Sequence, residues 1–407
     1  MPRISQRASA IFESPFRKYL PLAADAKARG VDVIHLNIGQ PDFRMPEIDF
    51  SNLDFKDYVP YGHAEGEAAL REAWCAYNRR FDIEIDPEHL LITTGASEGI
   101  LFALMAVADV GGEVIVPEPF YANYNGFAQM AGLVIKPIFS SITEGFAIPV
   151  KEEFEQAIGP RTKAILLSNP NNPSGKVYSR ETLEDLASLA RKHELFLIVD
   201  EAYSEFLYEG FDFYSALRLE GVDENVIVVD SVSKRFNGCG IRVGAIASRN
   251  EEIIEHIARF GRLRLSPPML GQKIALAALS LDRDYHQPVV KEFASRRDLL
   301  LSRLSQLPDV IFHAPEGAFY MLVRLPIKDS EHFCAWLLTD FQYQGKTVML
   351  SPGTGFYATL QKGTDEVRIA YILGKERLSS AMDCLEKALQ VYSGLEKTVS
   401  PAASTQP

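Results

Sequence analysis

Short runs of consecutive apolar residues recur through the middle of the chain, separated by segments with helical periodicity. Unbroken rather than alternating apolar positions are typical of strands that are covered on both faces of a sheet. The predicted strands are EVIVP (113–117), LVIK (133–136), AILLS (164–168), LFLIV (195–199), VIVVD (226–230) and VGAIAS (243–248).

The segment 179–193, between two of these strands, has the pattern of an amphipathic helix. Ser179 is a candidate N-cap. The apolar residues that follow share one helical face, namely Leu183, Leu186, Ala187 and Ala190. Strand, helix and strand in this order predict an α/β fold, in which helices lie on both sides of a mostly parallel sheet.

The character of the chain changes near residue 283. A helical pattern at 284–306 leads into FYMLVR, a helix near 331–340, KTVML, EVRIAYI and a last helix at about 376–393, which together predict a smaller α+β domain. We expect residues 1–45 to pack with this small domain. The large domain is predicted at 46–282, the small domain at 283–395 and a disordered tail at 396–407.

Charge and composition argue against a nucleic-acid-binding protein, a membrane protein and a metal-binding protein. The 407 residues carry a formal net charge of −12, which disfavours nucleic-acid binding, because neutralising phosphates requires clustered Lys and Arg. The chain lacks both an apolar signal segment and the run of about 20 apolar residues that a membrane span needs. The four cysteines and eight histidines show no metal-ligand spacing, and the dispersed cysteines indicate reduced thiols in a cytoplasm.

Polar residues follow several of the predicted strands. In open parallel sheets, ligands bind at the carboxyl ends of the strands, so these residues are candidates for a binding site. After VIVVD come Ser231, Ser233 and Lys234, with Arg242 eight residues beyond the lysine. Hydroxyls and an arginine can bind a phosphate, and a lysine with a lowered pKa can form a Schiff base. Tyr121 follows EVIVP and offers an aromatic face to a flat ring. Each of these signals has an alternative explanation when it is considered alone. The segment with Lys234 and Arg242 could be a solvated basic loop, and Tyr121 could be a core aromatic residue.

Other strand ends carry a carboxylate, an amide and small residues. Asp200 ends the LFLIV run, and a buried carboxylate there needs a partner such as a protonated ring nitrogen. Asn172 lies in NPNNPSG, a turn fixed by two prolines and a glycine. Gly95, Ala96 and Ser97 join a strand to an apolar helix, whose N-terminus can bind an anion. A helix cap, a metal ligand and ordinary turns are the alternatives here.

Taken in order, these elements resemble the class I and II aminotransferases, which are pyridoxal-phosphate (PLP) enzymes of fold type I in the aspartate aminotransferase superfamily. The resemblance covers the chain from about Leu36 to the final helix. It is carried by NPxNPSG at 169–175, by Asp200-x-x-Tyr203, and by Ser231-x-Ser233-Lys234 with Arg242. It implies a mostly parallel seven-stranded sheet in the large domain, PLP as the cofactor, and a homodimer with shared active sites.

The resemblance also implies a role for each matching residue. Lys234 carries the cofactor as a Schiff base and moves the proton of the substrate Cα. Asp200 keeps the pyridine nitrogen protonated, Asn172 and Tyr203 hydrogen-bond the phenolic oxygen, and Tyr121 stacks on the ring. Residues expected to bind the phosphate are Gly95, Ala96, Ser97, Ser231, Ser233, Arg242 and, from the neighbouring subunit, Tyr61. Residues expected to bind the substrate carboxylate are Arg368, Gly39 and Asn172.

The implied reaction moves the amino group of an L-α-amino acid to a 2-oxo acid, with 2-oxoglutarate as the expected acceptor, by a ping-pong mechanism. One departure concerns the donor. A subgroup that uses aspartate and prephenate has a lysine where Ser97 stands, and no other residue of the sequence is a clear replacement for that cation. The missing lysine argues against aspartate as the preferred donor and leaves alanine, methionine, aromatic and branched donors open.

Three other classes compete with this interpretation. A C–S lyase, a decarboxylase or a synthase of the same fold shares Lys234, Asp200 and Arg242 and differs in which Cα bond is broken. A serine hydrolase of the S-x-x-K type is the second, with Ser231 as nucleophile, but the Lys-Thr-Gly triplet of that class is absent. A cofactor-sensing DNA-binding regulator is the third, and the acidic charge disfavours it.

Overall fold

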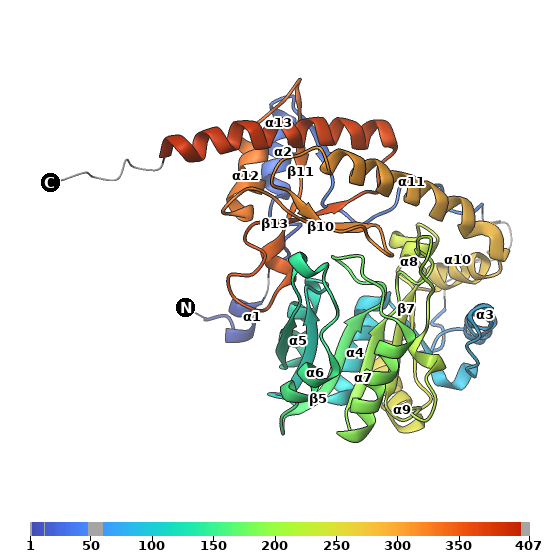
Figure 1. Cartoon of the computed structure of the whole chain (residues 1–407). Helices are drawn as coiled ribbons and strands as arrows, with labels where there is room; N and C mark the ends of the chain where they lie inside the picture. The colour runs from blue at the N-terminus through green and yellow to red at the C-terminus, as the bar shows by residue number, and fades with distance from the viewer. Residues whose placement is uncertain (1, 12, 48–59, 400–407) are drawn as a thin grey trace.

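The computed structural model describes the chain except for residues 1, 12, 48–59 and 400–407. Its largest sheet has seven strands in the order β2-β8-β7-β6-β5-β3-β4. In chain order, these strands are β2 Leu90–Thr93, β3 Glu113–Glu118, β4 Val134–Phe139, β5 Thr162–Ser168, β6 Phe196–Asp200, β7 Val226–Ser231 and β8 Gly244–Ala247. The sheet and its helices fill the lower half of the view in Figure 1.

Neighbouring strands of this sheet are parallel except at β8, which runs antiparallel to both β7 and β2. The mostly parallel seven-stranded sheet expected from the sequence is therefore confirmed. The strands β3 and β7 are buried at every position. Because both faces of the sheet are covered, no polar residues alternate with the apolar ones along these strands.

Successive residues of the central strands face two separate cores. On β5, Ile165 and Leu167 pack with α3, α7 and α10, whereas Ala164 and Leu166 pack with α4, α5 and α9. This follows from the period of two in a strand. The helices are α3 Ala68–Asn78, α4 Ala96–Val107, α5 Asn123–Ala131, α6 Lys151–Ala157, α7 Arg180–Lys192, α9 Glu251–Arg264 and α10 Met269–Leu279.

The amphipathic helix predicted at 179–193 is α7. The hydroxyl of Ser179 accepts the backbone N–H of Thr182 at 3.2 Å, so the predicted N-cap is present. The four residues of the predicted apolar face, Leu183, Leu186, Ala187 and Ala190, are all buried. The helix thus covers the sheet through the face that its sequence defines.

A second group of elements forms a smaller α+β layer at the top of Figure 1. Its sheet is antiparallel in the order β12-β13-β10-β9, and β1, near the N-terminus, pairs in parallel with β11. The elements are α2 Leu20–Ala28, β1 Asp32–His35, α11 His286–Leu304, β9 Ile311–Phe312, β10 Tyr320–Arg324, α12 Ser330–Thr339, β11 Lys346–Met349, β12 Ser351–Pro352, β13 Glu366–Ala370 and α13 Lys375–Val399. The short helix α1, Gln6–Ala10, has no buried residue and lies below this layer in Figure 1. The domain boundaries at 45, 282 and 395 stay predictions.

The last helix runs further than the sequence analysis predicts. Helix α13 continues to Val399, beyond the expected helix end near 393 and into the segment 396–407 that is predicted as a tail. Residues 396–399 contain neither glycine nor proline, and Pro401 is the first residue after them that disfavours a helix. Residues 400–407 of the predicted tail lie outside the described residues. Within the described residues, none of the helices combines the length and the apolar character that crossing a membrane requires.

Candidate active site

A cavity of about 560 Å³ opens at the carboxyl ends of β5, β6 and β7, and the smaller α+β layer contributes part of its wall. This volume is in the range that holds a small cofactor together with a substrate. Twelve of the residues predicted as site residues line it: Gly39, Ala96, Ser97, Tyr121, Asn172, Asp200, Tyr203, Ser231, Ser233, Lys234, Arg242 and Arg368. The structure therefore brings together residues that are more than 300 positions apart in the sequence.

Lys234 presents its amine to this cavity. It lies in the short helix α8, Val232–Arg235, which begins directly after β7. Its Nζ donates to the backbone carbonyl of Gly39 at 2.6 Å, and the Cys239 Sγ lies 3.7 Å from the same Nζ. Cys239 is half-buried and also lines the cavity.

Asp200 ends β6 and is buried against the sheet. Burial raises the pKa of this carboxyl to about 6, partly offset by hydrogen bonds from the Ala202 N–H at 3.2 Å and the Tyr124 hydroxyl at 3.0 Å. A cation placed beside the carboxylate would recover the free energy that desolvation costs. Asp200 thus suits the role of a partner for a protonated ring nitrogen. Tyr124 is not predictable from the sequence as a partner of Asp200, because no local pattern links the two residues.

The opposite part of the cavity suits an anion. Helix α4 begins at Ala96, and no side chain caps its first N–H groups. Arg242 approaches the same turn, since its Nη2 donates to the carbonyl of Thr94 at 3.2 Å. Gly95 does not line the cavity, but its lack of a side chain lets the Arg242 guanidinium approach the turn before α4. A Cβ on Gly95 would lie 2.4 Å from the Arg242 Nη2, and its φ of +77° is one that favours glycine.

Two hydroxyls complete this anion site. The Ser231 Oγ donates to the Ser233 Oγ at 2.8 Å and lies 3.1 Å from the carbonyl oxygen of Val243. Together with Arg242 and the N-terminus of α4, these hydroxyls form a donor set suited to a phosphate group. The residues present therefore fit the phosphate end of PLP.

Arg368, on β13, is a buried cation with free hydrogen-bonding capacity. Its Nη1 donates to the Asn172 Oδ1 at 3.0 Å and its Nη2 to the Asn37 carbonyl at 2.7 Å, whereas its buried Nε has no partner. Burial lowers the pKa of this guanidinium. No acidic side chain among the described residues forms an ion pair with it. A buried cation of this kind needs an anionic ligand, and a carboxylate matches its planar geometry.

Aromatic rings enclose the guanidinium of Arg368. The ring centroid of Tyr320 lies 4.4 Å from the guanidinium carbon, and those of Phe16 and Phe356 lie 4.9 and 5.0 Å away. The Tyr320 hydroxyl also shares a hydrogen bond of 2.8 Å with the hydroxyl of Tyr203. Burial raises the pKa of the Tyr203 phenol, which keeps this hydroxyl protonated and able to donate. Tyr320 was missed in the sequence because it comes from a distant strand.

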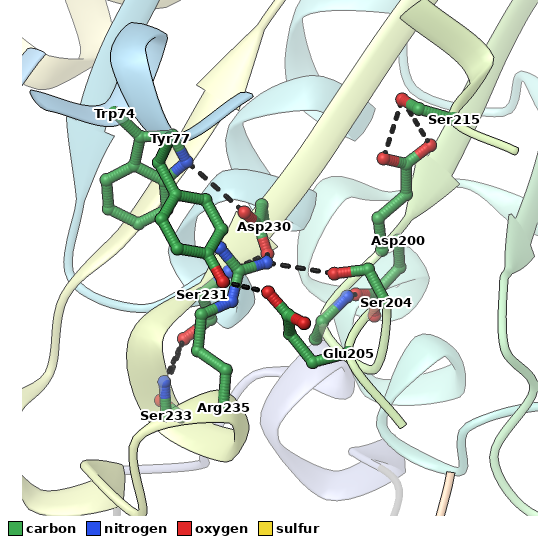
Figure 2. A network of polar contacts seen from close by, with 12 residues as sticks. Trp74, Tyr77, Asp200, Ser204, Glu205, Ser215, Asp230, Ser231, Ser233 and Arg235 are labelled. Atoms are coloured by element: carbon green, nitrogen blue, oxygen red, sulfur yellow. Dashed lines mark hydrogen bonds and ion pairs between the residues drawn. The ribbon is translucent and has the colours of Figure 1, made fainter. Parts of the chain in front are cut away.

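Figure 2 shows a buried ion pair between Asp230 and Arg235, the residue that follows Lys234 in the chain. Arg235 Nη2 donates to the Asp230 Oδ1 at 2.8 Å and to the Ser204 Oγ at 2.9 Å. The Asp230 carboxylate also accepts the Trp74 indole N–H at 3.2 Å and the Ser231 N–H at 2.7 Å. These contacts attach both ends of the turn that carries Lys234 to the sheet and to α3. Their signal in the sequence is the pair of opposite charges in D-S-V-S-K-R.

One predicted site residue lies away from the cavity of its own chain. Tyr61 does not line the cavity, and its side chain is 83% exposed. Its predicted contact is with a neighbouring subunit.

The amine of Lys234 donates to Gly39 and not to Ser231, whose hydroxyl is engaged with Ser233, so the arrangement lacks the activated serine of an S-x-x-K hydrolase. Among the described residues, no group of His, Cys, Asp and Glu could hold a metal ion.

The profile of the family described as "Aminotransferase class I and II" matches residues 31–385. The chain belongs to this family. The aspartate aminotransferase of Thermotoga maritima is 34% identical over 387 residues, which are 93% of this chain and 98% of that protein. The aromatic-amino-acid aminotransferase 2 of Thermococcus litoralis is 32% identical over 403 residues, with 95% and 98% of the two chains covered.

The fold agrees with this assignment to the class I and II aminotransferases. A mutant of Thermus thermophilus aspartate aminotransferase superposes with a TM-score of 0.86 at 31% identity, covering 95% of this chain and all of the other. The prediction of a PLP-dependent aminotransferase of fold type I is thereby confirmed. The relatives differ in the amino acid in their names, so membership of the family leaves the donor open.

Proposed function

We propose that this aminotransferase binds PLP covalently through Lys234 and transfers the amino group of an L-α-amino acid to 2-oxoglutarate. One observation carries the proposal. A single cavity holds an amine, a buried carboxylate, a phosphate-type donor set and a buried arginine with an unpaired Nε. These are the groups needed to hold the two ends of the cofactor, bind it covalently and fix the substrate carboxylate.

The bound cofactor supplies an electron sink for the pair of electrons left at the substrate Cα. The protein supplies position and proton transfer. Arg368 binds the α-carboxylate in a bidentate fashion, with Gly39 and Asn172 beside it. The Lys234 Nζ, which lines the same cavity, would take the proton from Cα when it is not bound to the cofactor, and this is general-base catalysis. The buried carboxylate of Asp200 would stabilise positive charge on the ring nitrogen of the bound cofactor.

We also propose that the active enzyme is a homodimer with shared active sites, in which Tyr61 contacts the phosphate of the partner subunit's cofactor. Apolar side chains near Tyr61 are exposed in the single chain. A Cβ on Gly62 would lie 2.3 Å from the Met269 Sδ, so Tyr61 lies near the start of α10. Leu270, in the first turn of α10, and Leu265, directly after α9, are both 51% exposed. An exposed cluster of this kind is typical of a subunit contact. The four unpaired cysteines support a cytoplasmic location.

Initial rates at varied concentrations of donor and 2-oxoglutarate, with identification of the products, test the proposal. A ping-pong transamination gives parallel double-reciprocal plots and one new amino acid for each 2-oxo acid formed. Release of ammonia with pyruvate, or of carbon dioxide, would instead assign the enzyme to the lyases or decarboxylases of this fold. Sedimentation of the holoenzyme tests the dimer, because a monomer with full activity would exclude a shared site.

A further inference from the structure

The charged side chains around the active-site cavity do not all have a role in the proposed function. The lining includes four cations and one carboxylate, namely Arg17, Lys234, Arg242, Arg368 and Asp200. Lys234 and Asp200 are assigned to the cofactor, Arg242 to its phosphate and Arg368 to the substrate α-carboxylate. Arg17 alone has no assigned partner. An arginine at a ligand cavity without a carboxylate partner in the protein is suited to bind a further anionic group of the ligand.

The chain holds Arg17 at the cavity wall through the residues on either side of it. The Asn37 Nδ2 donates to the Phe16 carbonyl at 3.0 Å, and Pro15 packs so closely on Gly355 that a Cβ there would lie 2.4 Å from the proline Cγ. The Tyr19 hydroxyl donates to the Glu331 carboxylate. The backbone around Arg17 is therefore fixed, while its side chain is exposed to the cavity and to solvent.

Two neighbouring cations of the same segment differ in their pairing. Lys18 forms an ion pair with Glu331 at 2.5 Å, whereas no acidic side chain of the described residues pairs with Arg17. The charge of Arg17 also acts inside the cavity. Burial raises the pKa of the Tyr121 phenol, and Arg368 and Arg17 are the cations that oppose this shift. Arg17 and Arg368 thus act on the same part of the cavity.

We propose that Arg17 binds the second carboxylate of dicarboxylic substrates and so determines that the enzyme prefers amino and 2-oxo diacids. This inference rests on the proposed function, in which Arg368 binds the first carboxylate. It also revises the expectation from Ser97. The cation that a lysine would supply at that position is provided here by a residue of the N-terminal segment.

The experiment compares substrates that differ only in the second carboxylate. The amino acids are L-glutamate and L-norvaline, and the unreactive ligands are glutarate and pentanoate. Holoenzymes of the wild type, Arg17→Gln, Arg17→Lys and the neighbouring control Lys18→Gln are assayed for kcat/KM and, by calorimetry, for Kd. A lost charged hydrogen bond lowers kcat/KM for glutamate and the affinity for glutarate about 10- to 100-fold in Arg17→Gln.

The predicted pattern is selective. Arg17→Gln leaves norvaline and pentanoate unchanged, Arg17→Lys recovers part of the glutamate activity, and Lys18→Gln keeps the wild-type ratio of glutamate to norvaline. Equal losses for both amino acids, or an unchanged affinity for glutarate, overturn the role of Arg17 while transamination itself stands. A wild type that releases no 2-oxo acid from either amino acid overturns the proposed function instead.

Discussion

Removing one partner of the buried ion pair between Asp230 and Arg235 is expected to destabilise the fold strongly. Their side chains are 12% and 3% exposed, and 2.8 Å separates the carboxylate Oδ1 from the guanidinium Nη2. Loss of one partner leaves the other charge buried and uncompensated, which costs about 3–5 kcal/mol. Asp230→Ala also removes the acceptor of the Trp74 indole N–H, so its loss of stability is expected at the upper end of this range. The loss of stability in Arg235→Met is expected at the lower end of the range, because Trp74 and Ser231 still donate to the Asp230 carboxylate.

The double variant Asp230→Ala with Arg235→Met buries neither charge. It is therefore expected to lose less stability than the two single variants combined, by a coupling of about 2–3 kcal/mol. Thermal unfolding is followed by circular dichroism at fixed protein and cofactor concentrations, because both shift Tm. At about 2 °C per kcal/mol for a chain of this size, each single variant loses about 6–10 °C. Losses that simply add in the double variant would refute the coupling, and an unchanged Tm in Asp230→Ala would refute the burial argument.

Three further predictions concern single residues. Burial raises the pKa of Glu201 from 4.5 to about 8, so its contribution to stability is lost as pH rises across that interval. The Tm of Glu201→Gln relative to wild type should therefore increase with pH, and a constant difference would exclude the shift. Gly95→Ala places a Cβ 2.4 Å from Arg242 and requires a φ of +77°, which should raise the Kd for PLP about 10-fold in equilibrium dialysis; an unaltered Kd would count against the phosphate site. Arg368→Lys loses the bidentate fork and should raise KM for all donors about 10- to 100-fold, whereas a change confined to one donor would contradict its assignment.

Much of the large sheet could be read from the sequence, because strands buried on both faces leave unbroken apolar runs. The run VGAIAS is identified as a strand, but nothing in its composition shows that β8 runs antiparallel to its neighbours. Likewise, the end of α13 depends on where a helix-breaking residue appears. Strand direction and helix length are set by packing and connection, which apolar periodicity alone does not encode.

The candidate site divides in the same way. Residues at strand ends, such as Asp200 and Lys234, are predictable, since the carboxyl ends of parallel strands meet at one edge. Their partners are not predictable from local pattern. Tyr124 reaches Asp200 from α5, and Tyr320 reaches Tyr203 from β10 across 117 positions of sequence. Partners of this kind are defined only once the elements are placed in space.

The most direct test of the account is the absorbance spectrum of the holoenzyme and of Lys234→Ala, each titrated with an amino acid in the absence of any 2-oxo acid. The wild type is expected to show a band from lysine-bound cofactor that is absent in Lys234→Ala. On addition of the amino acid, this band is expected to convert to that of pyridoxamine phosphate, with one 2-oxo acid released per site. A wild type that binds no PLP, or a Lys234→Ala variant that converts as the wild type does, would contradict the assignment of Lys234 and with it the proposed mechanism.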